Sequence, residues 1–282
     1  MLTLEQVCFG YEKHWVIQNI SLEVPRQTFM ALIGPNGGGK TTLLRLMSKV
    51  LRPQQGRILV QNKPLAEMGA RDLARRMAVI TSEQFFEFPY LVSDVVAMGR
   101  SPHLQRLQRM SQRDWDIVDQ ALKLTQVDHL GLRPVSQLSS GERQRVLIAR
   151  AIAQQPAVLM LDEPNAHLDI NHQIAIFNLL RSLNRDHKMT VIVVLHDLTW
   201  AAAFCQTVAL LHRGILVKIG RPEEVITAEL IRQTYGAEVV VYPSPLGGFP
   251  QVVYVPAGYG NRKRKKAKRE RVKRAKAQHQ NG

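Results

Sequence analysis

The chain is poor in cysteine, with only Cys8 and Cys205 among its 282 residues. Both lie in apolar surroundings and no C-x-x-C pair occurs, which argues against a disulfide framework or a thiolate metal site. Long apolar runs are also missing. A bilayer-spanning helix needs about 18 to 20 apolar residues, and the longest candidate, 190–204, is broken by His196 and Asp197. With no charged and then apolar leader, we expect a protein of a reducing compartment that is soluble or peripheral on its own.

Acidic residues are scarce relative to basic ones, 23 against 38, which gives a net charge of +15. The excess is concentrated in residues 261–282, which hold eleven Lys or Arg and one acidic residue, Glu270. This segment has almost no apolar side chains, so the sequence predicts a disordered basic tail after a folded domain over residues 1–260. The tail can bind anionic lipid or RNA, or be merely solvated. It lacks the interleaved aromatics that stack on bases.

A glycine-rich stretch that fits G-x-x-x-x-G-K-[ST] stands out in the amino-terminal part of the chain. It follows an apolar run, 29–33, that is typical of a buried strand, and it precedes a helical pattern over 43–47. Glycine lets backbone N–H groups turn inward, and the N-terminus of the next helix favours anions. This context argues against a ligand-free turn. The candidate nucleotide-binding residues are Gly34, Pro35, Asn36, Gly37, Gly38, Gly39, Lys40, Thr41 and Thr42.

Polar residues end two other apolar runs. Residues 158–161 lead into Asp162 and Glu163, and residues 190–195 lead into His196. In α/β proteins ligands bind at the carboxyl ends of strands. Asp162 can hold Mg²⁺ through water together with the Thr41 hydroxyl, Lys40 can reach the β and γ phosphates, and Glu163 can polarise an attacking water. His196 can contact the γ-phosphate or the water, although a lone histidine is more often structural.

Several other features allow two interpretations. Tyr11 can stack on a purine or cap a core edge. The apolar loop 85–90 can face a partner or pack under a subdomain. Residues 93–135 look like a helical insertion in which Ser93 caps a helix through residue 98. Ser139 is expected to cap another helix, whose N-terminus is a second possible phosphate-binding surface.

The order of these motifs resembles the ATP-binding subunit of an ABC transporter over residues 1 to about 255. Within that family the chain is similar to the importer ATPases for iron–siderophores, haem and vitamin B12. The resemblance implies an α/β fold, a P-loop NTPase core of the ABC type with an antiparallel β portion and a helical subdomain at about 83–155. The stretches that carry the subfamily similarity are 96–103, 141–146, 167–173 and 195–198.

The resemblance also implies roles for individual residues. Tyr11 would stack on adenine. Phosphate and Mg²⁺ would be held by Lys40, Thr41 and Thr42, and Asp162 would be the aspartate of the family's second nucleotide-binding motif. Glu163 would be the catalytic base and His196 the switch histidine. The signature that contacts the γ-phosphate of the opposite subunit would be Ser139, Ser140, Gly141 and Glu142, and Asp169 would communicate across the dimer.

The sequence departs from the family pattern at three of these positions. Ser140 stands where the signature usually has its first glycine, and Glu142 replaces the common glutamine, as is usual in this subfamily. The family also has a glutamine in a loop before the helical subdomain, called the glutamine loop. Ungapped counting back from Phe88 and Pro89 places this residue at Ser82. Because positions 82 and 84 share one face of a strand, we assign Gln84 as the catalytic and Mg²⁺-binding glutamine.

The resemblance implies the ATP-hydrolysing subunit of an importer for an iron chelate, haem or a corrinoid. Its cofactors would be ATP and Mg²⁺. It would work as a homodimer or paired with a second ATPase subunit, on permease subunits that face residues 82–103 and with an extracytoplasmic substrate-binding protein. It would be peripheral on the cytoplasmic face of the membrane. The alternatives are a non-transport ATPase that acts on nucleic acid or ribosomes through its tail, and an exporter or an importer of another subclass.

Overall fold

The computed structural model describes residues 1–12, 14–81 and 89–256. Gln84, Ser82, most of the aromatic loop and the basic tail, for which the sequence makes predictions, lie outside these residues. Over the described ranges the helices are too short or too polar for any of them to cross a membrane.

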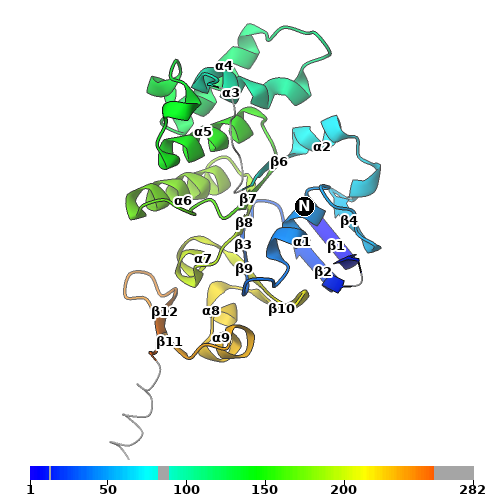
Figure 1. Cartoon of the computed structure of the whole chain (residues 1–282), viewed down its shortest axis with the longest axis vertical. Coiled ribbons are helices and arrows are strands. Elements are labelled where there is room, and N and C mark those ends of the chain that lie inside the picture. The colour runs from blue at the N-terminus through cyan, green and yellow to red at the C-terminus, as the bar shows by residue number, and fades with distance from the viewer. Residues whose placement is uncertain (13, 82–88, 257–282) are drawn as a thin grey trace, which may run out of the picture.

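A six-stranded sheet forms the centre of the molecule (Figure 1). Its strands run in the order β10-β9-β3-β8-β7-β6, and all neighbours are parallel except β10, which pairs antiparallel with β9. The strands are β3 (Phe29–Ile33), β6 (Met77–Ile80), β7 (Val158–Asp162), β8 (Thr190–Val194), β9 (Thr207–His212) and β10 (Ile215–Gly220).

Both faces of the sheet are buried at β3, β7 and β8, which explains the continuous apolar runs of these strands. Along β3, Phe29 and Ala31 point into one hydrophobic cluster, and Met30 and Leu32 point into another. Helices α6 (Ile170–Arg185) and α7 (Leu198–Phe204) contribute to the first cluster. Helix α1 (Lys40–Met47) and a second, antiparallel sheet contribute to the other. That sheet has the order β2-β1-β4-β5, with β1 (Leu2–Tyr11), β2 (His14–Val24), β4 (Gln55–Val60) and β5 (Lys63–Pro64).

A helical segment with its own hydrophobic cluster lies at one end of the molecule (Figure 1). The predicted cap of its first helix is wrong, because Leu91 and not Ser93 occupies the N-cap position. The first N–H groups of that helix, from Val92 and Ser93, donate to the carbonyls of Arg133 and Gly131, so they need no side-chain cap. The segment contains α3 (Val92–Ala97), η2 (Met98–His103), α4 (Gln112–Leu124), η3 (Asp128–Leu130), η4 (Val135–Gln137) and α5 (Ser140–Ala153).

Side chains of the short helix η2 contact both α4 and the C-terminal end of α5. The buried Arg100 guanidinium lies 3.0 Å from the carboxylate of Asp114 in α4, and it donates to the Ala153 carbonyl at 2.8 Å. The His103 ring is 2.9 Å from the carbonyl of Gln154. A carbonyl at a helix C-terminus has no partner within the helix, so η2 supplies two of the missing partners of α5.

The remaining elements connect the two sheets or complete the opposite end of the molecule. Strand β6 follows α2 directly, and β11 pairs antiparallel with β12 beyond α8 and α9 (Figure 1). These elements are η1 (Leu65–Glu67), α2 (Ala70–Arg76), α8 (Pro222–Val225), α9 (Ala228–Tyr235), β11 (Val239–Pro243) and β12 (Pro250–Tyr254).

Candidate active site

The glycine-rich loop connects the carboxyl end of β3 to the first turn of α1, as the sequence predicts. Two of its glycines are required by the backbone. Gly34 has φ 147°, and a Cβ on it would lie 2.1 Å from the carbonyl oxygen of Leu211. Gly39 has φ 98° and is the N-cap of α1. Because L-residues with side chains rarely adopt such φ values, the loop can take this path only with glycine here.

Lys40 points back into the loop from the start of α1. Its buried ammonium donates to the carbonyls of Gly34 at 2.8 Å and Pro35 at 3.0 Å. Burial lowers the pKa of Lys40, and the nearby carboxylates of Glu163 and Asp162 act in the opposite direction. An anion held by the loop would favour the charged ammonium further. The lysine therefore fits a phosphate-binding role.

Asp162 ends β7 beside the first turn of α1. The Thr41 hydroxyl donates to its carboxylate at 3.3 Å. Burial raises the pKa of Asp162, while the hydrogen bond from Thr41 opposes this shift. A hydroxyl and a buried carboxylate are the hard oxygen donors that Mg²⁺ accepts. Over the described ranges no three His, Cys, Asp or Glu side chains gather around a possible metal position, so Mg²⁺ here would also need phosphate oxygens and water.

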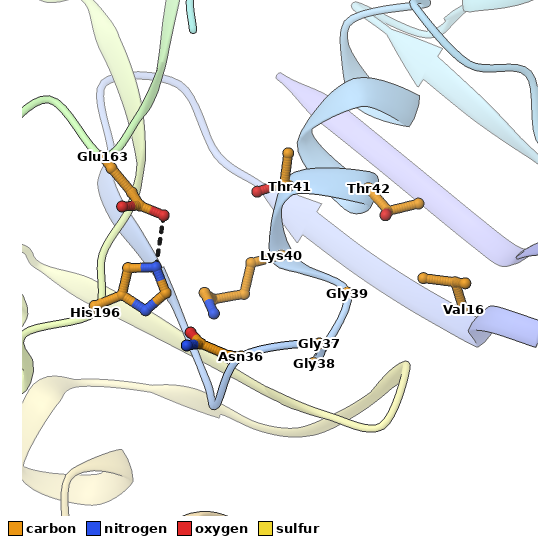
Figure 2. A pocket seen from close by; sticks show the side chains of 10 residues that line it. All are labelled: Val16, Asn36, Gly37, Gly38, Gly39, Lys40, Thr41, Thr42, Glu163 and His196. Carbon is orange, nitrogen blue, oxygen red and sulfur yellow. Dashed lines mark hydrogen bonds and ion pairs between the residues drawn. The ribbon is translucent and has the colours of Figure 1, made fainter. Parts of the chain in front are cut away.

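Glu163 and His196 lie next to each other on one side of the site. The Nε2 atom of His196 lies 2.5 Å from the Oε1 atom of Glu163 (Figure 2). Glu163 has φ 51°, an uncommon conformation for a residue with a side chain, and its N–H donates to the carbonyl of Val194 at 3.2 Å. Such backbone positions are frequent at active sites.

These groups surround one cavity of about 290 Å³ (Figure 2). The sequence analysis missed Val16 among its lining residues, because nothing in the alternating pattern of β2 separates it from other strand residues. Asp162 lies just behind Thr41, outside the lining. The cavity is lined by Val16, Asn36, Gly37, Gly38, Gly39, Lys40, Thr41, Thr42, Glu163 and His196.

Tyr11 lies at the end of β1 and is 46% exposed. Its ring packs edge-on against Phe9, with ring centroids 5.0 Å apart. It is not among the cavity-lining residues in the described part of the chain. The structure therefore leaves about half of Tyr11 exposed, and its predicted role in stacking on adenine stays a prediction.

Ser139 is the N-cap of α5, which confirms the predicted cap. Its hydroxyl accepts from the Glu142 N–H at 3.3 Å, and its own N–H donates to the Glu142 carboxylate at 2.8 Å. The hydrogen bond from the Ser139 N–H is the main reason that the pKa of Glu142 is lowered. Glutamate at this position thus completes a reciprocal cap. Ser140 and Gly141 form the first turn of α5.

Asp169 is the N-cap of α6, where its carboxylate accepts from the N–H of His172 at 2.8 Å. Neither Asp169 nor any residue of 139–142 lines the cavity formed by the phosphate loop of the same chain. The structure therefore brings together the loop, Asp162, Glu163 and His196, and it keeps the second predicted phosphate-binding surface apart from them.

Comparisons with known proteins agree with this geometry. A family model described as ABC transporter matches residues 17–166. The ferric enterobactin transport ATP-binding protein FepC of Escherichia coli K12 is 38% identical over 249 residues, which cover 88% of this chain and 92% of the relative. The hemin import ATP-binding protein HmuV of Escherichia coli O157:H7 is 35% identical over 259 residues, with 90% and 99% covered.

Solved structures agree as well. A metal-chelate type ABC transporter in an inward-facing conformation matches with a TM-score of 0.80 and 28% identity, over 91% of this chain and 98% of that one. A dimeric bacterial ABC transporter cassette matches with a TM-score of 0.69 and 25% identity, over 79% of this chain and 99% of that one.

Proposed function

Because the chain belongs to the ABC transporter family, we propose that it is the ATP-hydrolysing subunit of an importer for an iron chelate, haem or a corrinoid. ATP binding and hydrolysis are the activity of this family. The choice of cargo class is supported by two of the relatives, which are named as ATP-binding proteins of ferric enterobactin transport and of hemin import. The observation that carries the catalytic part is the meeting of the phosphate loop, Asp162, Glu163 and His196 at the carboxyl ends of β3, β7 and β8.

Each group then has a chemical task. The loop N–H groups and Lys40 would hold the phosphates. Thr41 and Asp162 would hold Mg²⁺, which would neutralise charge on the transferred phosphoryl group. Glu163 orients the attacking water and takes its proton. His196 holds the Glu163 carboxylate in place through the 2.5 Å hydrogen bond and lies close enough to the cavity to contact the γ-phosphate. Tyr11 supports the adenine, and Gln84 would add a ligand to Mg²⁺.

The signature and Asp169 act on a second subunit. Because Ser139 to Glu142 are outside the cavity of their own chain, they can complete a nucleotide site only across a dimer. ATPase subunits of such importers work as dimers together with permease subunits. Two copies, or this chain and a paired ATPase subunit, would enclose two ATP molecules, with Asp169 at the contact between them.

The helical subdomain, about 83–155, would present residues 82–103 to the permease. In the described part of this stretch, two large apolar residues are partly exposed, Tyr90 with 40% and Met98 with 41% of its surface accessible. The subunit would therefore lie on the cytoplasmic face of the membrane, and a substrate-binding protein would deliver cargo to the opposite face.

Purification of the tagged full chain from its own host in mild detergent tests this function. We expect a polytopic membrane protein to co-purify in near-equal amount. Ribosomes or nucleic acid that remain at high salt without a membrane protein would contradict it. The basic tail, which can contact anionic lipid or RNA, provides a second test. Removal of residues 261–282 should leave ATP hydrolysis nearly unchanged, whereas an ATPase that acts on nucleic acid through the tail would lose its function.

A further inference from the structure

His172 lies between the two predicted trans-acting elements, the N-terminus of α5 and the N-terminus of α6. Helices α5 and α6 lie side by side in the fold (Figure 1). The His172 ring is packed so closely on Gly141 that a Cβ there would lie 2.1 Å from the ring atom Cδ2. The same ring places Nδ1 2.8 Å from the carboxylate of Asp169. One imidazole therefore contacts the signature glycine with one edge and the Asp169 carboxylate with the other.

This arrangement adds little to the stability of the fold. The Asp169 side chain is 65% exposed and that of His172 is 35% exposed, and exposed polar pairs contribute little to the free energy of folding. The carboxylate oxygen already accepts the backbone N–H of His172, so the N-terminus of α6 is capped without the ring. The second bond, from Nδ1, has the effect of fixing the ring orientation against Gly141.

We propose that His172 is a positioning residue that holds the signature turn, 139–142, and the Asp169 carboxylate in one fixed relation, so that both meet the nucleotide site of the opposite subunit together. This inference rests on the proposed function. It also explains from a single chain why residue 141 is glycine, because the His172 ring occupies the space that any side chain at 141 would need. A residue without a ring at 172 leaves the two elements free to move separately.

Substitutions at 172 distinguish the effect of the hydrogen bond from Nδ1 to Asp169 from the effect of the space that the ring fills. In His172→Asn the amide nitrogen takes nearly the position of Nδ1 and can still donate to Asp169. In His172→Gln the amide lies one bond further out, near Nε2, with similar bulk. The proposed positioning needs both contacts. Asn keeps the bond to Asp169 but not the packing on Gly141, Gln keeps the bulk beside Gly141 but not the bond, and Ala keeps neither, so all three should lose the function. Simple space filling predicts instead that Gln retains it.

The first experiment measures ATP-driven dimerisation by sedimentation, with Glu163→Gln as the parent so that ATP is bound and not consumed. We expect His172→Ala, His172→Gln and His172→Asn each to weaken dimerisation about tenfold. ATP affinity of the monomer should not change, because His172 is remote from the phosphate loop. Dimerisation of any of the three variants at parental strength would overturn the inference.

The second experiment uses the single chain and does not depend on dimerisation. Hydrogen exchange of the amides in 139–143 and 169–173 should accelerate in His172→Ala and in Gly141→Ala, whose new methyl group displaces the ring. The double variant should exchange no faster than either single variant, because both disturb the same contact. Additive acceleration, or none, would overturn the inference. A parent that binds ATP without dimerising would instead contradict the proposed function, and the exchange data would still decide the role of His172.

Discussion

Glu163 and His196 are 33 residues apart in the chain and share a hydrogen bond of 2.5 Å. They meet because β7 and β8 are parallel neighbours in register, with Asp162 opposite Val194. Both strands end at the same edge of the sheet, next to the loop that follows β3. The two side chains therefore face one cavity from adjacent strand ends, where a base and the group that orients it can act on one water molecule.

Loss of the His196 ring should impair catalysis more than binding. Without it, Glu163 loses the partner that fixes its carboxylate. We expect His196→Ala to lower the hydrolysis rate at least ~100-fold, in the range by which positioned acid–base groups contribute, with ATP affinity changed less than about threefold. Phosphate release and nucleotide titration measure the two quantities. His187→Ala, at an exposed loop position, is the control and should hydrolyse at the parental rate.

Tyr11 provides a test of adenine stacking. We expect Tyr11→Ala to weaken ATP binding about tenfold, because a base stacked on an aromatic side chain contributes about 1–3 kcal/mol. Tyr11→Phe should bind as the parent does, since the ring is kept. Equal ATP affinity of the alanine and phenylalanine variants would instead assign Tyr11 to packing against Phe9.

Gly99 of η2 packs directly against α5. A Cβ at this position would lie 2.2 Å from the carbonyl oxygen of Arg150. We expect Gly99→Ala to lower the free energy of unfolding by about 1–3 kcal/mol, the usual effect of overpacking. Gly247→Ala is the control, because a Cβ there would make only ordinary contacts with the Phe249 ring, at 3.5 Å or more, and it should change stability by less than about 0.5 kcal/mol. Urea unfolding curves that coincide for the two variants would contradict this account of the contact.

The buried pair of Asp114 and Arg100 predicts a pH dependence. Hydrogen bonds from the Ser111 side chain and backbone, and then Arg100, hold the pKa of Asp114 below its usual value. A depressed folded-state pKa stabilises the fold above the unfolded pKa of about 3.9, and this stabilisation is lost as pH falls through the folded-state pKa. Asp114→Asn should therefore cost about 3 kcal/mol at pH 7, where Arg100 is left buried without a counter-charge.

The comparison with the parent should change with pH in a defined direction. The stability difference between parent and Asp114→Asn should shrink below about pH 4, where Asp114 itself becomes neutral. Urea titrations at neutral and acid pH measure it. Asp116→Asn, on an exposed position of the same helix, should differ little from the parent at both pH values. A difference that stays constant down to acid pH would show that the charge of Asp114 is not what matters.

Local patterns were sufficient for the parts of the site that lie within one strand and its following turn. The phosphate loop, Asp162 and Glu163 could be predicted because a buried parallel strand dictates where its end lies. Contacts between distant segments could not. The sequence gives no sign that Arg100 reaches the end of α5 or that His172 covers Gly141, since each depends on how helices pack. The wrong cap at Ser93 has the same cause, because carbonyls from residues 131 and 133 satisfy that helix start.

We propose that Glu163 is the base with which this chain hydrolyses ATP. Glu163→Gln keeps the size and hydrogen-bonding capacity of the side chain and removes its ability to accept a proton. Measured side by side with the parent chain, the variant should bind ATP with unchanged affinity and release phosphate at least ~100-fold more slowly. Phosphate release at the parental rate would contradict the assignment of Glu163 and, with it, the mechanism proposed for this site.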